Sequence, residues 1–289
     1  MDTITFREGQ GNNQTATLVV NRCTERIEVR GSWNWLICLS QNDGEVVTSL
    51  VVGHPLRKEC YELPPLSMHF DKTMLGLGFD ASTNTLKMVC ILCKSNMVSD
   101  NPDVVWKNLC TMVHVFGTNS WQEIPQVPSY SITDKVVFAN GCLHWLVSHL
   151  DVPIEDGGRP VIWFNVEKEE FGLIDPPKRK CDLWRNYICR YDQVVDLNGE
   201  VGYVCTRTME FWLLNHKKEW VPHCRFAKHI VPYGYIEVLG CWNKVGDMLI
   251  RHQANGRYAF LVYNLKNGVK HKSNIDGLDE ARSPNVDPT

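Results

Sequence analysis

Long hydrophobic runs are missing from this sequence. No stretch of about 18 apolar residues occurs in the chain, so no transmembrane helix is recognisable. The amino-terminal segment MDTITFREGQGNNQ is polar and lacks the apolar region of a secretory signal peptide. We therefore expect a protein of the cytoplasm, the nucleus or both.

Concentrated positive charge is missing as well. The chain has 30 Lys and Arg against 33 Asp and Glu, a formal net charge of −3, and its basic residues are scattered apart from PPKRK at 176–180. Nucleic-acid-binding proteins normally carry a basic patch or stripe. The sequence therefore predicts neither nucleic acid nor membrane as a partner.

Motifs for enzymatic chemistry are scarce. The sequence has no G-x-S-x-G, and Gly76 and Gly78 lack the third glycine of a dinucleotide-binding loop. We attribute these glycines to a close approach of the backbone to neighbouring strands. Cys90 and Cys93 form a C-x-x-C without a second pair, in a predicted strand where residues three apart point to opposite faces. We expect no enzymatic activity, no catalytic residue, no metal site and no cofactor.

An aromatic residue recurs near the end of successive extended segments. Trp121, Phe171 and Trp220 are separated by 50 and 49 residues. Such a period is typical of a four-stranded unit repeated around an axis. The spacing therefore predicts a β-propeller, although an aromatic near a turn can also simply fill the core of another all-β domain.

Turn and strand signals recur in the same order as these aromatics. Asn-Gly or Asn-Lys precedes an apolar run in ANGCLHWLV (139–147), LNGEVGYVC (197–205) and WNKVGDMLI (242–250), and Asn-Gly favours tight hairpin turns. Short β-branched or aromatic strands end at Asn165, Asn215 and Asn264. We predict an all-β propeller of about six blades, with five or seven as alternatives, over a sandwich or a mixed fold.

The predicted organisation is a single propeller domain with two flanking segments. Residues 1–27 are interpreted as a loop with one or more strands, residues 28–275 as the propeller, and residues 276–289 as a disordered tail. The first blade then needs completion, either by strands from 14–30 or by the carboxy-terminal strand.

Two segments between strands concentrate residue types that are common at binding hot spots. They are 181–191 (CDLWRNYICRY) and 225–236 (RFAKHIVPYGYI). The alternative is that these side chains pack on blade edges and seal the propeller. The candidate protein-binding residues are Trp184, Arg185, Tyr187, Tyr233 and Tyr235.

An ordered series of segments resembles a known family. The series begins with GSWNWLICLS (31–40), HPLRKECYELPPL (54–66) and LGLGFDASTNTLKMVCIL (75–92), and it continues to VLGCWNKVGDMLIRH (238–252). It is similar to the kelch-like F-box-associated domain of plant F-box proteins over about residues 28 to 275. Where that family often has a small residue after the first Asn, this chain has Trp35 after Asn34.

The resemblance implies a protein-interaction module that selects targets for an SCF-type ubiquitin ligase. In that family an amino-terminal F-box binds a Skp-type adaptor and, through it, a cullin, but residues 1–27 are too few for the F-box helices. A truncated chain, a natural recognition domain and an F-box supplied by another protein all remain open. The alternatives are a propeller that binds a small molecule or glycan in its channel, or a propeller enzyme.

Overall fold

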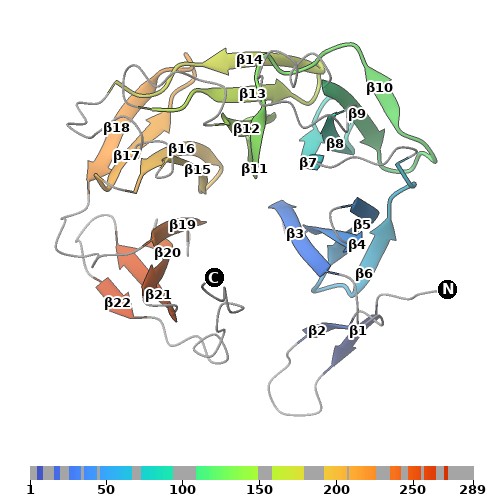
Figure 1. Cartoon of the computed structure of the whole chain (residues 1–289), viewed down its shortest axis with the longest axis horizontal. Coiled ribbons are helices and arrows are strands. Elements are labelled where there is room, and N and C mark those ends of the chain that lie inside the picture. The colour runs from blue at the N-terminus through green and yellow to red at the C-terminus, as the bar shows by residue number, and fades with distance from the viewer. Residues whose placement is uncertain are drawn as a thin grey trace, which may run out of the picture. The chain divides into compact units, whose positions relative to one another are not determined.

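The structure is a computed structural model in which every described regular element is a β-strand (Figure 1). No helix among the described residues is long and apolar enough to cross a membrane. The described residues are 5–8, 16–19, 26–33, 36–43, 46–66, 73–93, 109–148, 158–178, 192–206, 208–225, 235–241, 247–254, 257–264 and 270–272.

The strands form five four-stranded antiparallel sheets, each built from four consecutive strands, and one two-stranded sheet. The two-stranded sheet contains β1 (Thr5–Glu8) and β2 (Ala16–Val19). The first and second four-stranded sheets contain β3 (Arg26–Trp33), β4 (Leu36–Asp43), β5 (Val46–His54) and β6 (Glu59–Glu62), then β7 (Thr73–Asp80), β8 (Thr85–Cys93), β9 (Leu109–Val115) and β10 (Gln122–Ile124). The third contains β11 (Ile132–Ala139), β12 (Cys142–Val147), β13 (Val161–Asn165) and β14 (Glu170–Ile174). The fourth and fifth contain β15 (Asp192–Leu197), β16 (Glu200–Cys205), β17 (Glu210–Leu214) and β18 (Trp220–Arg225), then β19 (Tyr235–Cys241), β20 (Asp247–Ala254), β21 (Arg257–Asn264) and β22 (Lys270–Lys272).

The chain divides into two compact units, which are described separately. The first comprises Met1–Asp151 and Ile162–Leu173, and the second comprises Val152–Val161 and Ile174–Thr289. Within the first unit, the first strands of its three sheets, β3, β7 and β11, contact one another (Figure 1). Within the second unit, β15 contacts β19.

The all-β prediction is confirmed, and the blade count lies at the lower end of the predicted range. Among the described strands, five sheets have the four-stranded blade pattern, whereas β1 and β2 pair only with each other and form no sixth blade. The first blade is completed by β3, which overlaps the predicted 14–30 segment, and in the described residues no carboxy-terminal strand joins it. The predicted tail at 276–289 lies outside the described residues.

Both predicted Asn-Gly turns are two-residue hairpins. Asn140 and Gly141 have φ values of 53° and 72°, and Asn198 and Gly199 have 58° and 87°. Positive φ at both central residues is the geometry that matches the twist of paired strands, and Asn and Gly adopt it at little cost. The turns therefore fix the registers of β11 with β12 and of β15 with β16. The Asn-Lys turn at 242–246 lies outside the described residues.

The recurring aromatics occupy equivalent places in the outermost strands of three sheets. Trp121 lies immediately before β10, Phe171 lies in β14 and Trp220 begins β18. The Trp121 Nε1–H donates to the Pro64 carbonyl at 2.8 Å, just beyond the outermost strand of the preceding sheet. The spacing noted in the sequence is thus the repeat length of the blades.

Each unit has its own apolar core, made by the alternate side chains of its strands. In the first unit, Gly76 leaves space for the third sheet, because a Cβ there would lie 2.8 Å from Leu143 Cδ1 and 2.9 Å from Trp145 Cζ2. The expected close approach at this glycine is therefore made by side chains of β12. One buried cluster of the first unit contains Cys38, Leu50, Val52, Leu63, Leu75, Leu77, Met88, Cys90, Leu92 and Cys110. The cluster of the second unit contains Val195, Leu197, Val204, Met209, Phe211, Ile236, Val238, Met248, Ile250, Leu261 and Tyr263.

Candidate protein-interaction cleft

The binding residues expected from the sequence fall almost entirely outside the described part of the chain. Trp184, Arg185, Tyr187 and Tyr233 lie in segments that the structure does not describe. Tyr235 is the first residue of β19, where its backbone pairs with Gln253 of β20, and its side chain is not described. Those residues stay a prediction, and the described residues offer a different surface.

A cleft of about 480 Å³ opens in the first unit between the first and second four-stranded sheets. Its volume lies within the range of about 300 to 1,000 Å³ that is typical of ligand pockets. Side chains on β4, β5, the β5–β6 turn, β6 and one end of the β8–β9 pair, where β8 begins and β9 ends, line it. The lining residues are Leu36, Val52, His54, Arg57, Glu59, Cys60, Tyr61, Leu86 and Phe116. We call this surface the Tyr61 cleft.

Tyr61 forms one aromatic wall of the cleft. The residue is 36% exposed, and it lies in β6, an edge strand in which every residue is exposed. Its ring centroid lies 5.1 Å from that of Phe116 and 6.1 Å from that of the buried His114, and its hydroxyl donates to the Thr118 carbonyl at 3.3 Å. Contacts to a neighbouring sheet therefore hold a large exposed ring in a defined position.

His114 supports this wall from beneath. The imidazole is fully buried, packs 5.4 Å from the Trp121 ring, and has Nδ1 3.1 Å from the Ser120 carbonyl. Because a carbonyl only accepts hydrogen bonds, Nδ1 carries the hydrogen. The loop after β9 and the ring of Tyr61 are thus tied to the same buried imidazole.

The mouth of the cleft carries charge of both signs. Arg57 lies in the turn between β5 and β6 and Glu59 begins β6, and both are exposed. Neither forms an ion pair with a described residue. Leu56 in the same turn is 70% exposed. Tyrosine and arginine, which Tyr61 and Arg57 supply here, are residue types that are enriched at protein-binding hot spots.

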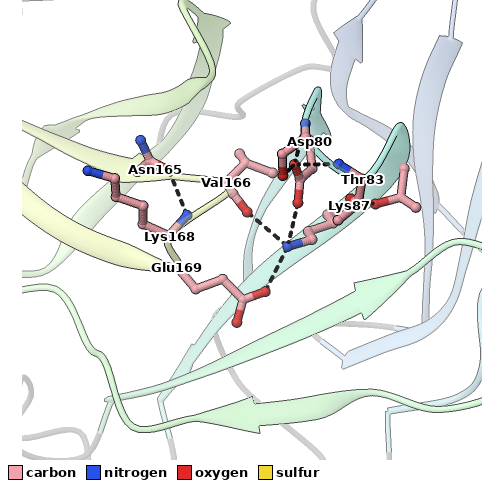
Figure 2. A network of polar contacts seen from close by, with 9 residues as sticks. Asp80, Thr83, Lys87, Asn165, Val166, Lys168 and Glu169 are labelled. Atoms are coloured by element: carbon pink, nitrogen blue, oxygen red, sulfur yellow. Dashed lines mark hydrogen bonds and ion pairs between the residues drawn. The ribbon is translucent and has the colours of Figure 1, made fainter.

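A buried lysine lies elsewhere in the first unit, where it joins the second and third sheets. Figure 2 shows Lys87 Nζ directed at Asp80 Oδ2, Glu169 Oε1 and the Val166 carbonyl, at 3.1, 2.9 and 3.0 Å. Burial alone would lower the pKa of Lys87, but the hydrogen bonds that it donates to Glu169 and Asp80 raise this pKa above its ordinary value. The amine therefore stays protonated at neutral pH, and its geometry is that of a structural cation rather than a nucleophile or base.

Sequence reasoning missed the Tyr61 cleft, although a signal for it was present. Tyr61 and Arg57 lie in HPLRKECYELPPL, where three prolines and a short polar strand suggest no binding function by themselves. The cleft forms because Phe116 and Leu86 of the second sheet come to lie beside that segment. The available signal was an Arg and a Tyr four positions apart in a polar segment. The same residue types also occur at 181–191 and 225–236, and the sequence favoured those segments.

Two solved structures have a distant likeness to this chain. The chain aligns over 94% of its length with 64% of a protein of unknown function from Bacteroides thetaiotaomicron, at 11% identity and a TM-score of 0.46. It aligns over 91% of its length with 45% of a chain from a study of two prolyl endopeptidases, at 10% identity and a TM-score of 0.49. The chain thus spans less than two thirds of either protein, and no curated protein matches it significantly.

The family comparison agrees with the propeller fold. The model of the F-box associated beta propeller domain matches residues 7–286, which is nearly the whole chain. A match of this extent includes all five four-stranded sheets. The chain therefore belongs to the F-box associated β-propeller domain family.

Proposed function

We propose that this chain is a protein-interaction domain that binds a target protein through the Tyr61 cleft. The observation that supports this most is the cleft itself, where Tyr61, Phe116 and Arg57 offer an aromatic wall and an exposed guanidinium. A few residues supply most of the binding energy in protein interfaces, and tyrosine and arginine are enriched among them. The family match suggests the same kind of role in an F-box context.

The proposed role is recognition and positioning, without catalysis by this chain. When an F-box is supplied, the target would be presented to a Skp-type adaptor and cullin assembly, on which ubiquitin transfer occurs. We further propose that it acts in the cytoplasm or nucleus of a plant cell, as the family resemblance implies.

Affinity capture tests this proposal. The whole chain serves as bait in plant extract beside three variants: Arg57→Glu with Tyr61→Ala in the cleft, the combined alanine variant of Trp184, Arg185, Tyr233 and Tyr235, and Lys217→Glu, in the exposed turn between β17 and β18, as a surface control. We expect a target that also binds the purified chain directly and that the cleft variant does not retain. Co-capture of Skp-type and cullin subunits would indicate ligase contact.

Two outcomes would contradict parts of the proposal. Captured proteins that show no direct binding to the purified chain would argue against an interaction module. Direct binding that the loop variant alone abolishes would keep the interaction role but move the site from the Tyr61 cleft to the segments at 181–191 and 225–236.

A further inference from the structure

We propose that the Tyr61 cleft takes a short segment of a partner protein in which an apolar side chain stands next to an Asp or Glu. This inference rests on the proposed function and adds the chemical class of the segment. Its argument depends on the shape of the cleft, the rigidity of its wall and the hydrogen-bonding groups at its mouth.

The floor of the cleft is suited to one apolar side chain. Val52 is only 3% exposed, and Leu36, Leu86 and Phe116 are half-buried at its sides. An inserted side chain would therefore meet apolar atoms from two sheets and remove them from water, which is favourable at about 25 cal/mol per Å² of apolar surface.

The aromatic wall is ordered before anything binds. Tyr61 packs on Phe116 and His114, and its hydroxyl is bonded to Thr118 across the two sheets. A ring fixed in this way loses little conformational entropy when a ligand packs on it, so more of the contact energy appears as affinity. The cleft consequently fits a flat or branched apolar group better than a polar one.

The mouth of the cleft presents hydrogen-bond donors to such a segment. The backbone N–H of Arg57 donates to His54 Nδ1 at 3.3 Å, so this nitrogen accepts and the neutral imidazole carries its hydrogen on Nε2. His54 Nε2–H and the guanidinium of Arg57 are then two donors at one mouth. A guanidinium without an ion pair to any described residue is the best side chain for a planar carboxylate, which it binds through two parallel bonds.

Glu59 limits the kind of acidic segment that fits. Its carboxylate lines the same cleft, so a segment with several successive acidic residues would be repelled. A single carboxylate placed toward Arg57, with its apolar neighbour between Tyr61 and Phe116, meets the donors and leaves Glu59 free to contact a donor of the partner. Charge complementarity therefore favours one carboxylate beside an apolar residue.

Selection from a library of short random peptides displayed on phage tests this inference. The immobilised whole chain is compared with Arg57→Glu, Tyr61→Ala and, as a control, Lys217→Glu in the exposed turn between β17 and β18, after circular dichroism has shown that each variant is folded. We expect the chain and Lys217→Glu to enrich peptides with an apolar residue next to Asp or Glu. Tyr61→Ala should lose the enrichment.

Affinity measurements on one enriched synthetic peptide give the sharper readout. Arg57→Glu should weaken binding about tenfold, because a hydrogen bond to a charged group contributes about 1.5 kcal/mol or more. Replacing the peptide's acidic residue by Lys should restore part of the binding to Arg57→Glu and weaken binding to the unaltered chain.

Enrichment of peptides without an acidic residue, no enrichment at all, or equal binding by Arg57→Glu would overturn the inference. The proposed function would survive these results if a captured target still bound the purified chain directly. The two failures are therefore distinguishable.

Discussion

Lys87 is a buried cation whose acceptors come from two different sheets. Asp80 lies at the end of β7, whereas Val166 and Glu169 lie in the turn between β13 and β14 (Figure 2). The carboxylate of Asp80 is 2% exposed and also accepts from Ser82 Oγ at 2.7 Å. Because charges removed from water are costly unless they are paired, this network depends on all of its members.

Replacing Lys87 by Met should lower the free energy of unfolding by about 3 kcal/mol, because it leaves the Asp80 carboxylate buried without its cation. Lys168→Met is the matched control, since Lys168 lies in the neighbouring turn with an exposed side chain, and it should change stability by less than about 0.5 kcal/mol. Urea denaturation monitored by circular dichroism measures both. Equal free energies of unfolding for the two variants would show that the ion pairs of Lys87 do not stabilise the fold.

The outermost strands repeat one aromatic contact along the chain. Trp220 Nε1–H donates to the Asp175 carbonyl at 2.7 Å, just past the end of β14, as Trp121 donates to the Pro64 carbonyl past the end of β6. Phe171 occupies the equivalent place in β14 but has no N–H, and its ring packs 4.7 Å from that of Phe164. An aromatic ring thus recurs at the start of the outermost strand in these three blades. Trp121 and Trp220 also donate a hydrogen bond there, whereas Phe171 contributes its ring alone.

Trp220→Phe should lower the free energy of unfolding by about 1 kcal/mol. The variant keeps an aromatic ring against Tyr203, whose centroid lies 5.3 Å away, but it leaves the Asp175 carbonyl without the indole donor. Trp220→Leu should cost more, because the contact between the rings is lost too. Thermal denaturation compares the two, and a Phe variant as stable as the unaltered chain would show that solvent replaces the indole bond without loss.

Acid stability is a property of the whole molecule to which Asp80 contributes. The hydrogen bond from Ser82 lowers the pKa of Asp80, burial opposes this, and Lys87 and Thr83 lower the pKa further, to well below its ordinary value. A carboxyl with a depressed pKa stabilises the folded state above its unfolded pKa of about 3.9, and this contribution is lost as the pH falls through the lower folded value. The raised pKa of Lys87 has no effect until the alkaline range, above about pH 10.4.

We therefore expect the free energy of unfolding to fall less below about pH 4 in Asp80→Asn than in the unaltered chain. Between pH 5 and 7 the two should differ by a constant amount, because Asp80 stays ionised there in both folded and unfolded states. Urea titrations across this pH range provide the measurement. Parallel curves down to the most acidic condition would mean that Asp80 does not have a depressed pKa in the folded protein.

Local signals in the sequence were enough to predict much of the blade structure. Asn140 and Gly141 form their turn because of their own backbone preferences, and the spacing of Trp121, Phe171 and Trp220 follows from the length of one blade. The number of blades did not follow from local signals, because a short strand can add to a blade or, as β1 does with β2, pair outside one. The predicted binding residues at 184–187 and at 233 lie outside the described residues, so that prediction is untested.

The sequence by itself therefore determined the all-β class, the repeat length and the hairpin turns, since each depends on residues close together in the chain. The tertiary structure alone decided the Tyr61 cleft and the Lys87 network. Tyr61 meets a carbonyl 57 residues away, and Lys87 meets a carboxylate 82 residues away. Partners at such separations are brought together only when sheets pack side by side, and no local preference of the chain encodes which side chains then meet.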